Sequence, residues 1–218
     1  MQREIVTTSD GSSTIFFSEW KEHCHSIHGA IQEANHVFIK MGLSLFSSGE
    51  VAILEIGFGT GLNAFITLLE AEKRNLTISY VGVEAYPITL EEVEKLNYPK
   101  QLNASEEIFR LLHEKPWEQN IEISSRFNLK KRQQFFEQIN DASQYDLIYF
   151  DAFGAGVQPE LWTVSIFKKM YQALKPKGVL VTYAAKGSVR RAMLEVGFKV
   201  ERLPGPPGKR EMLRATVG

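Results

Sequence analysis

A glycine-rich segment is the first part of this sequence whose residue types could serve chemistry. It reads Glu55-Ile-Gly57-Phe-Gly59-Thr60-Gly61-Leu-Asn63 and overlaps the end of an apolar run at residues 51–57. Glycines at this spacing permit a tight turn and a close approach of the backbone to a ligand, beside the N–H groups that open a helix. The dinucleotide fingerprint G-x-G-x-x-G would place its third glycine where this chain has Leu62, so the pattern here is G-x-G-x-G after an acidic residue. A purely structural turn is the alternative.

Two carboxylates stand at the ends of expected strands. Glu84, followed by Ala85, closes an apolar run and could accept two hydrogen bonds from a ribose diol; a helix cap or a solvated side chain is the alternative. Asp151 emerges from a second apolar run, where burial would raise its pKa, so it could accept a proton or hold an amine. Phe153 could stack on a planar substrate. Loop capping by Asp151 and core packing by Phe153 are the alternatives.

Basic residues concentrate near the end of a chain whose net charge is only −1. Residues 186–218 hold eight basic side chains against three acidic ones. Bases that converge on the ligand side of a sheet favour a polyanionic substrate such as nucleic acid, and a solvated surface is the alternative. Five of these bases follow the expected strands at 179–185 and 198–203: Lys186, Arg190, Arg191, Lys209 and Arg210.

Metal-binding side chains are few. The single cysteine, Cys24, excludes an intrachain disulfide and a thiolate-rich metal cage. His23, Cys24, His25 and His28 are close in sequence, but they lack the spacing of a known metal motif and lie far from the glycine segment. We therefore expect no metal.

The composition is that of an ordinary globular protein, with 218 residues, 44% of them hydrophobic and 23% charged. No apolar run approaches the length of a membrane span, and the first residues lack the apolar core of a signal peptide. We expect a cytoplasmic protein with no membrane partner. The sequence carries no signal for an oligomeric state.

The expected elements alternate between strands and helices, which predicts βαβ units and a mostly parallel, doubly wound sheet. Ligands of such sheets bind beyond the carboxyl ends of the strands. The last two runs are joined by a link too short for a crossover helix, so they should form an antiparallel hairpin. We expect residues 1–48 to form an extension, with a β-hairpin and a helix at 19–41, and residues 49–218 to form the main domain. Strands are expected at 51–57, 80–85, 127–132, 146–152, 179–185, 198–203 and 211–217, and helices at 62–69, 89–96, 106–113, 165–174 and 188–196.

Taken together, the glycine segment, the two strand-end carboxylates and the terminal hairpin resemble the class I S-adenosylmethionine-dependent methyltransferases. That resemblance implies a Rossmann-like, seven-stranded sheet of order 3-2-1-4-5-7-6 with strand seven antiparallel. Four segments are more specifically similar to the methyltransferase domain of the MnmC family, whose members modify the wobble uridine of tRNA. The likeness covers nearly the whole chain, and the four segments read LEIGFGTGLNAF, YFDAFGAGVQPELW, VRRAMLEVGFKVERL and GKREMLRA.

The resemblance implies roles for particular residues. S-adenosylmethionine would be the cofactor, with the glycines beneath its methionine and ribose, Glu84 on the ribose hydroxyls, and Asp151 facing the methyl group and a substrate amine. The remaining cofactor contacts would come from Glu55, Thr60, Asn63 and Ala85. tRNA would be the substrate, contacted by Phe153 and by Lys186, Arg190, Arg191, Lys209 and Arg210.

The sequence departs from the family pattern in two places. The FAD-dependent oxidase half of the bifunctional family members is missing, so we expect the chain to need a ready-made aminomethyl-uridine and a separate oxidase partner. Many class I methyltransferases have an acid near the adenine after the third strand, where this chain reads Gln133-Gln134-Phe135. We expect backbone groups, an amide or apolar contacts to hold the adenine instead.

Two other functions remain open. An aminopropyltransferase of the spermidine-synthase type shares this architecture and also needs a carboxylate near an attacking amine. A non-catalytic RNA-binding module with a relict cofactor pocket is the alternative from another class.

Overall fold

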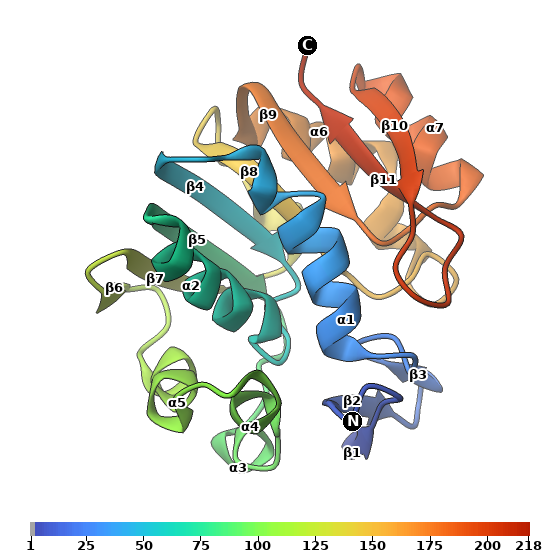
Figure 1. Cartoon of the computed structure of the whole chain (residues 1–218). Helices are drawn as coiled ribbons and strands as arrows, with labels where there is room; N and C mark the ends of the chain where they lie inside the picture. Colours follow the sequence, from blue (N-terminus) through green and yellow to red (C-terminus); the bar gives the residue numbers. More distant parts are fainter. Residues whose placement is uncertain (1–2) are drawn as a thin grey trace.

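An eight-stranded β-sheet organises the computed structural model, which describes residues 3–218 (Figure 1). β11 is antiparallel to both of its neighbours and β6 is antiparallel to β7, whereas the other pairs are parallel. Seven strands reproduce the expected order 3-2-1-4-5-7-6, including the terminal hairpin. From one edge to the other the strands are β10 (Lys199–Pro204), β11 (Glu211–Thr216), β9 (Leu174–Thr182), β8 (Tyr145–Phe150), β4 (Gly49–Ile56), β5 (Leu76–Glu84), β7 (Phe127–Gln133) and β6 (Asn120–Ser124).

The eighth strand, β6, corrects the expected count of seven. It is five residues long and pairs only with β7, at the edge of the sheet. None of its residues is fully buried, so its sequence lacks the continuous apolar run that marks the inner strands.

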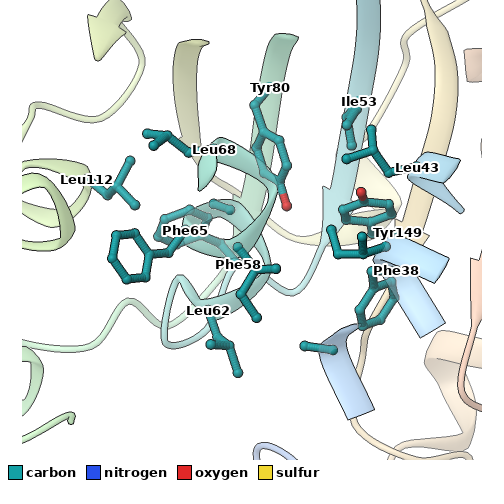
Figure 2. Packing of buried hydrophobic residues seen from close by; sticks show 14 of the residues in the cluster. Phe38, Leu43, Ile53, Phe58, Leu62, Phe65, Leu68, Tyr80, Leu112 and Tyr149 are labelled. Carbon is teal, nitrogen blue, oxygen red and sulfur yellow. The ribbon is translucent and has the colours of Figure 1, made fainter. Parts of the chain in front are cut away.

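Two hydrophobic cores, one on each face, explain why β4 is apolar along most of its length. Val51 and Ile53 belong to the core that includes α2 (Leu62–Arg74) and α5 (Glu106–Glu114). Figure 2 shows this core, with Phe65 and Leu68 of α2 packed beside Tyr80 of β5. Leu54 and Ile56 belong to the second core, which is covered by α6 (Val164–Ala173) and α7 (Gly187–Val196). These are the two helical layers expected of a doubly wound sheet.

The first residues form a separate antiparallel sheet of three strands, β1 (Arg3–Thr7), β2 (Ser13–Phe17) and β3 (Glu22–His23). The expected hairpin is confirmed, with Gly11 in its turn at a φ of 83°. The expected helix over 19–41 is wrong in its first half, because the structure begins α1 only at Ala30 (Ala30–Ala34).

Backbone hydrogen bonds explain this difference. The N–H of Cys24 donates to Ile15 of β2 (2.9 Å), and that of Ser9 donates to Ile27 (2.8 Å), so the segment before α1 lies against the hairpin. After α1 the chain continues as a wider helical turn, Asn35–Lys40, and a short 3-10 turn, Leu43–Leu45.

Short elements complete the chain. The helix expected at 89–96 is reduced to α3 (Leu90–Val93), which Thr89 and Glu92 cap reciprocally, and α4 (Tyr98–Leu102) follows it. 3-10 turns occupy Phe136–Gln138 and Pro159–Trp162. Among residues 3–218, no helix combines the length and the apolar character needed to cross a membrane.

Candidate active site

A pocket of about 250 Å³ lies beyond the carboxyl ends of the central strands. Its walls come from the loops after β4, β5, β7 and β8, together with the segment between β2 and α1. Parallel strands bring their carboxyl ends to one edge, so these loops converge although they are distant in sequence. The lining residues are Trp20, Cys24, His25, Gly57, Phe58, Gly59, Thr60, Leu62, Asn63, Glu84, Ala85, Tyr86, Phe135, Phe136, Glu137, Asp151, Ala152, Phe153, Gln158, Glu160 and Leu161.

The glycine loop between β4 and α2 forms the floor of this pocket. The N–H groups of Gly57 and Phe58 both donate to the carbonyl of Val83 in β5 (3.0 Å each), which fixes the turn. Gly57 has a φ of 91°, and a Cβ there would lie 2.8 Å from the Asp151 carbonyl oxygen, so only glycine fits. Within residues 3–218, a Cβ on Gly59 would have no neighbour nearer than 3.8 Å, so this part of the loop leaves space for a ligand.

Glu84 is held at the end of β5 by two backbone amides. Gly59 donates its N–H to Oε2 (3.0 Å), and Tyr86 donates to Oε1 (2.9 Å). Each carboxylate oxygen keeps a further lone pair. The side chain can therefore hold the glycine loop and still accept hydrogen bonds from hydroxyl groups in the pocket.

Asp151 lies where β8 ends, opposite the glycine loop. Its N–H donates to the Ile56 carbonyl (2.9 Å), and its Oδ2 accepts a hydrogen bond from Asn63 Nδ2 (2.8 Å). Burial raises the pKa of this carboxyl to about 7, and the nearby Glu33 adds to the rise, while Asn63 and the Lys209 ammonium oppose it. A carboxyl with this pKa can exchange a proton near neutral pH.

The structure places Glu55 behind the pocket wall rather than on it. The side chain is fully buried, does not line the pocket, and accepts a hydrogen bond from Asn63 Nδ2 at Oε1 (2.9 Å). Burial raises its pKa well above the usual range of glutamate. The cofactor-binding role expected for Glu55 stays a prediction, and such a role would have to act through Asn63.

The other expected loop residues fall into two groups. Thr60 lines the pocket and accepts a hydrogen bond from the buried Tyr98 hydroxyl (3.2 Å), and Ala85 lines it beside Glu84. Gly61, by contrast, lies against the ring of His113, away from the pocket.

Aromatic residues form the wall near Asp151. The ring of Phe153 lies 5.1 Å from both Phe17 and Trp20, measured between ring centroids, and its carbonyl accepts a hydrogen bond from the Trp162 indole (2.7 Å). Phe153 therefore faces the pocket from a braced loop. Trp20, Cys24 and His25 were not expected here, since only the pairing of β2 with β3 brings their segment to this edge.

Tyr86 and Phe135 also line the pocket, and both are about half exposed. Their rings are 6.0 Å apart in an edge-to-face arrangement. Each is the second residue after a strand, β5 or β7, so their position just after expected strand ends could have identified them as pocket residues. Phe135 provides an apolar surface directly after the Gln133-Gln134 pair, and Glu137, two residues further along, is an acid not expected at this site that also lines the pocket.

The five expected basic residues lie at the same edge of the sheet, but none of these described side chains lines the pocket. Lys209 forms an ion pair with the buried Glu33 of α1, and its ammonium lies 3.9 Å from the centroid of the Tyr183 ring. Arg190 is half-buried. The remaining three are exposed and form no ion pair within residues 3–218: Lys186, Arg191 and Arg210.

Nothing in the described part of the chain gathers three or more metal-ligating side chains. Of the sequence cluster considered above, His25 contacts the Thr14 hydroxyl (3.2 Å) and lines the pocket, and burial lowers its pKa to about 4. Burial raises the pKa of the Cys24 thiol. Both side chains are therefore neutral at pH 7.

The residues around the pocket fit S-adenosylmethionine. The open space at Gly59 admits a ligand against the loop, and Glu84 offers carboxylate oxygens for a ribose diol. Asn63 presents a buried acceptor, Oδ1, that has no hydrogen-bond partner in residues 3–218. An ammonium group is a suitable partner for such an oxygen, and Phe135 and Leu161 supply apolar surface for a planar base.

Comparison with known proteins gives the family. Across 205 residues the chain is 29% identical to the "tRNA 5-methylaminomethyl-2-thiouridine biosynthesis bifunctional protein MnmC" of Ectopseudomonas mendocina (strain ymp), covering 84% of this chain and 30% of that protein. The crystal structure of MnmC2 from Aquifex aeolicus matches all of this chain and 70% of its own, with a TM-score of 0.80 and 26% identity. Spermidine synthase from Thermotoga maritima, at a TM-score of 0.54 and 16% identity, shares only the fold.

The chain thus spans about 30% of the length of the curated relative it matches. Residues 106–218, more than half of the chain, match a family model described as S-adenosyl-L-methionine-dependent methyltransferase. The expected resemblance is confirmed, and with it the cofactor. The chain belongs to the family of S-adenosyl-L-methionine-dependent methyltransferases.

Proposed function

We propose that this chain transfers a methyl group from S-adenosylmethionine to the primary amine of 5-aminomethyluridine, or its 2-thio form, at the wobble position of tRNA. The observation that carries the proposal is Asp151, a carboxyl with a pKa of about 7 in the pocket wall beside the glycine loop. The substrate class is supported by relatives named for tRNA 5-methylaminomethyl-2-thiouridine biosynthesis.

The reaction places a specific demand on this carboxyl. When bound, the cofactor supplies a methyl group on a positively charged sulfur, which leaves as a neutral thioether. An alkyl amine is largely protonated at neutral pH, with the lysine pKa near ~10.4 as a guide, and its nitrogen is then not nucleophilic. Asp151 Oδ1 has no hydrogen bond within residues 3–218, so it can accept the proton that the amine must lose before the new C–N bond forms.

The remaining residues bind and orient. Glu84 would hold the ribose hydroxyls, and Phe135 would contact the adenine. Phe153 and Trp20 would border the substrate base, splayed out of its loop as enzymes that modify bases require. The exposed Lys186, Arg191 and Arg210 would contact RNA phosphates, whereas the charge of Lys209 is already balanced by Glu33.

Mass spectrometry of tRNA nucleosides tests this function. tRNA that carries 5-aminomethyluridine is incubated with the enzyme and isotope-labelled S-adenosylmethionine, and we expect the labelled methyl group on that nucleoside alone. Asp151→Asn should lower turnover at least about 100-fold, as removal of a general base does, while the cofactor dissociation constant changes little.

The same experiment separates the two other functions. Decarboxylated S-adenosylmethionine and a polyamine replace the substrates in a parallel reaction, and product there would identify an aminopropyltransferase. The absence of any cofactor binding in calorimetry would favour a non-catalytic RNA-binding module. Methylation of tRNA lacking the aminomethyl group would contradict the proposed substrate.

A further inference from the structure

Asn63 joins two carboxyl groups that lie on different strands. It is the second residue of α2, directly after the glycine loop. Its Nδ2 donates one hydrogen bond to Glu55 Oε1 of β4 (2.9 Å) and another to Asp151 Oδ2 after β8 (2.8 Å). β4 and β8 are neighbours in the sheet, with Ile56 beside Phe150, so the amide spans adjacent strand ends.

The orientation of the amide follows from these bonds. An –NH₂ group has two hydrogens, and both are used, one on each carboxyl. The reverse orientation would place Oδ1 against two carboxyl oxygens, which could donate only if both groups were protonated. Asn63 Oδ1 therefore points away from the carboxyls and has no partner within residues 3–218.

Glu55 lies in surroundings that do not support a negative charge. The side chain is fully buried and forms no ion pair in the described part of the chain. Burial raises its pKa most, and the polar side chains of Asn63 and Tyr80 oppose the rise. The charges that act on it, Asp151 and Glu84, have the same sign and raise its pKa further. A buried carboxylate without a cation costs several kcal/mol, and such a group takes up a proton instead. Its Oε2, which has no hydrogen-bond partner within residues 3–218, can carry that proton.

We propose that Glu55, Asn63 and Asp151 form one hydrogen-bonded network, in which Glu55 is a neutral carboxylic acid and Asn63 is a positioning residue for Asp151. Asn63 fixes the Oδ2 atom of Asp151 and leaves the Oδ1 atom of Asp151 free to face the pocket. Its importance for turnover rests on the proposed function, whereas the network itself is a property of the free protein.

The network also sets the pH at which Asp151 ionises. A hydrogen bond from Asn63 favours the charged form of Asp151, and a neutral Glu55 adds no repulsion. Two other charged groups act on Asp151, Glu33 of α1 and Lys209 of the β10–β11 loop. Asp151 in turn acts on Glu55 of β4, Tyr80 of β5, Tyr183 after β9, Cys24 after β3 and Tyr98 of α4.

Carbon-13 NMR titration of the side-chain carboxyls in the cofactor-free protein tests the network. Asp151→Asn assigns the Asp151 signal. In the unaltered protein we expect Asp151 to titrate near neutral pH and Glu55 to stay protonated across that range. Asn63→Leu should move the Asp151 titration upward. A rise of about one pH unit would lower its ionised fraction at neutral pH about fivefold.

Glu55→Gln is the matched variant. It keeps a neutral group of the same shape with an oxygen that accepts from Asn63, so the Asp151 titration should not move. Methylation kinetics should agree, with an unchanged pH profile in Glu55→Gln and an acid limb displaced upward in Asn63→Leu. The NMR result needs no substrate, so it stands even if aminomethyl-uridine is not the acceptor.

Three results would overturn the proposal. The first is an Asp151 titration unaffected by Asn63→Leu in a protein that is folded by circular dichroism. The second is a fall in the Asp151 titration in Glu55→Gln, which would mean that Glu55 carries a charge. The third is a Glu55 signal that titrates below pH 6 in the unaltered protein. The second and third remain decisive if Asn63→Leu does not fold.

Discussion

Asp151 combines a role in the proposed chemistry with a cost in stability. Its side chain is partly buried at the end of β8, and Asn63 is the only side chain of residues 3–218 that donates a hydrogen bond to its carboxyl. Burial destabilises the charged form, so the folded protein binds a proton at this site more tightly than the unfolded chain does. A residue kept at such a cost is typical of an active site.

The pH dependence of stability should reveal this cost. Because the pKa of Asp151 rises from 3.8 to about 7 on folding, its stabilising contribution is complete below the unfolded value and is lost as pH rises through 7. We expect Asp151→Asn to melt several degrees above the unaltered protein at pH 8. The gap should shrink as pH falls from 7 toward 4, because the carboxyl is neutral in both states only below the unfolded value of 3.8. Thermal unfolding followed by circular dichroism measures it.

Asp141 provides the control of opposite sign. Arg132 donates hydrogen bonds to both of its oxygens (2.7 and 2.9 Å), and the pKa of Asp141 is lowered because these bonds and the guanidinium charge outweigh its partial burial. Its stabilisation is present above the unfolded value and is lost as pH falls. Asp141→Asn should therefore melt below the unaltered protein at pH 8. A lower melting temperature for both variants at that pH would contradict the burial argument for Asp151.

At the scale of elements, the glycine loop connects β4, β5 and β8. Gly57 N–H binds to β5, while its α-carbon lies against the Asp151 carbonyl after β8. The loop therefore couples the cofactor side of the pocket to the residue proposed to accept the proton. A side chain at this position would separate strand ends that the site needs close together.

Gly57 and Gly49 form a matched pair for testing this coupling. Their φ angles are 91° and 93°, so a Cβ strains the backbone similarly at both positions. A Cβ at Gly57 would meet the Asp151 carbonyl at 2.8 Å, whereas one at Gly49 would have no atom of the described chain within 4 Å. We expect Gly49→Ala to cost about 1–2 kcal/mol in unfolding free energy and to bind the cofactor normally. Gly57→Ala should cost more and weaken cofactor binding at least tenfold in calorimetry. Equal cofactor affinities would show that the clash is relieved without moving the site.

The elements also show where sequence reasoning succeeds. The strands buried on both faces are short apolar runs bounded by glycine or charged residues, so β4, β8 and β9 could be located from local pattern alone. Their alternation with helices then predicts that Gly57, Glu84 and Asp151 meet at one edge. All three line the pocket. This part of the site depends on where strands end, which the local pattern indicates.

The remainder depends on contacts between distant segments. Residues 19–29 were expected to be helical, but residues 22–24 pair with β2, and the segment brings Trp20, Cys24 and His25 to the pocket. The partner of Lys209 is Glu33, 176 residues away, whereas Lys209 was expected to contact the substrate. Edge strand β6 is specified by its neighbour β7 rather than by an apolar run. All three features depend on contacts between segments that are distant in sequence or on a neighbouring strand, and the spacing of residues along the chain does not predict such contacts.

At the scale of the whole molecule, the near-zero net charge hides an uneven distribution. β9 and β10 run parallel on either side of β11, so the loops after them share the carboxyl edge of the sheet with the pocket (Figure 1). Lys186 lies in the first of these loops, Arg191 in α7 that follows it, and Arg210 in the second loop, and all three are exposed. An RNA docked there would place its phosphates on these basic side chains and its splayed nucleobase at the pocket. The basic side chains would then supply affinity for the polyanion, and the pocket would supply specificity for the nucleobase.

The salt dependence of tRNA binding tests this arrangement. Each phosphate contact releases counterions and contributes about 0.7–0.9 to the slope of log affinity against log salt concentration. We therefore expect the combined Arg191→Ala and Arg210→Ala variant to bind tRNA more weakly and to lower that slope by about 1.5. Fluorescence anisotropy with labelled tRNA at several salt concentrations measures both quantities.

Two further variants make the measurement specific. Lys199 is exposed at the amino end of β10, on the edge opposite the pocket, so Lys199→Ala should leave the slope unchanged. Lys209→Met should also leave the slope nearly unchanged, because its ammonium pairs with Glu33, but it should raise the pH at which Asp151 ionises by removing a nearby cation. If Lys199→Ala lowers the slope as much as the double variant does, the RNA does not dock at the carboxyl edge, and the proposed path of the wobble base into the pocket fails.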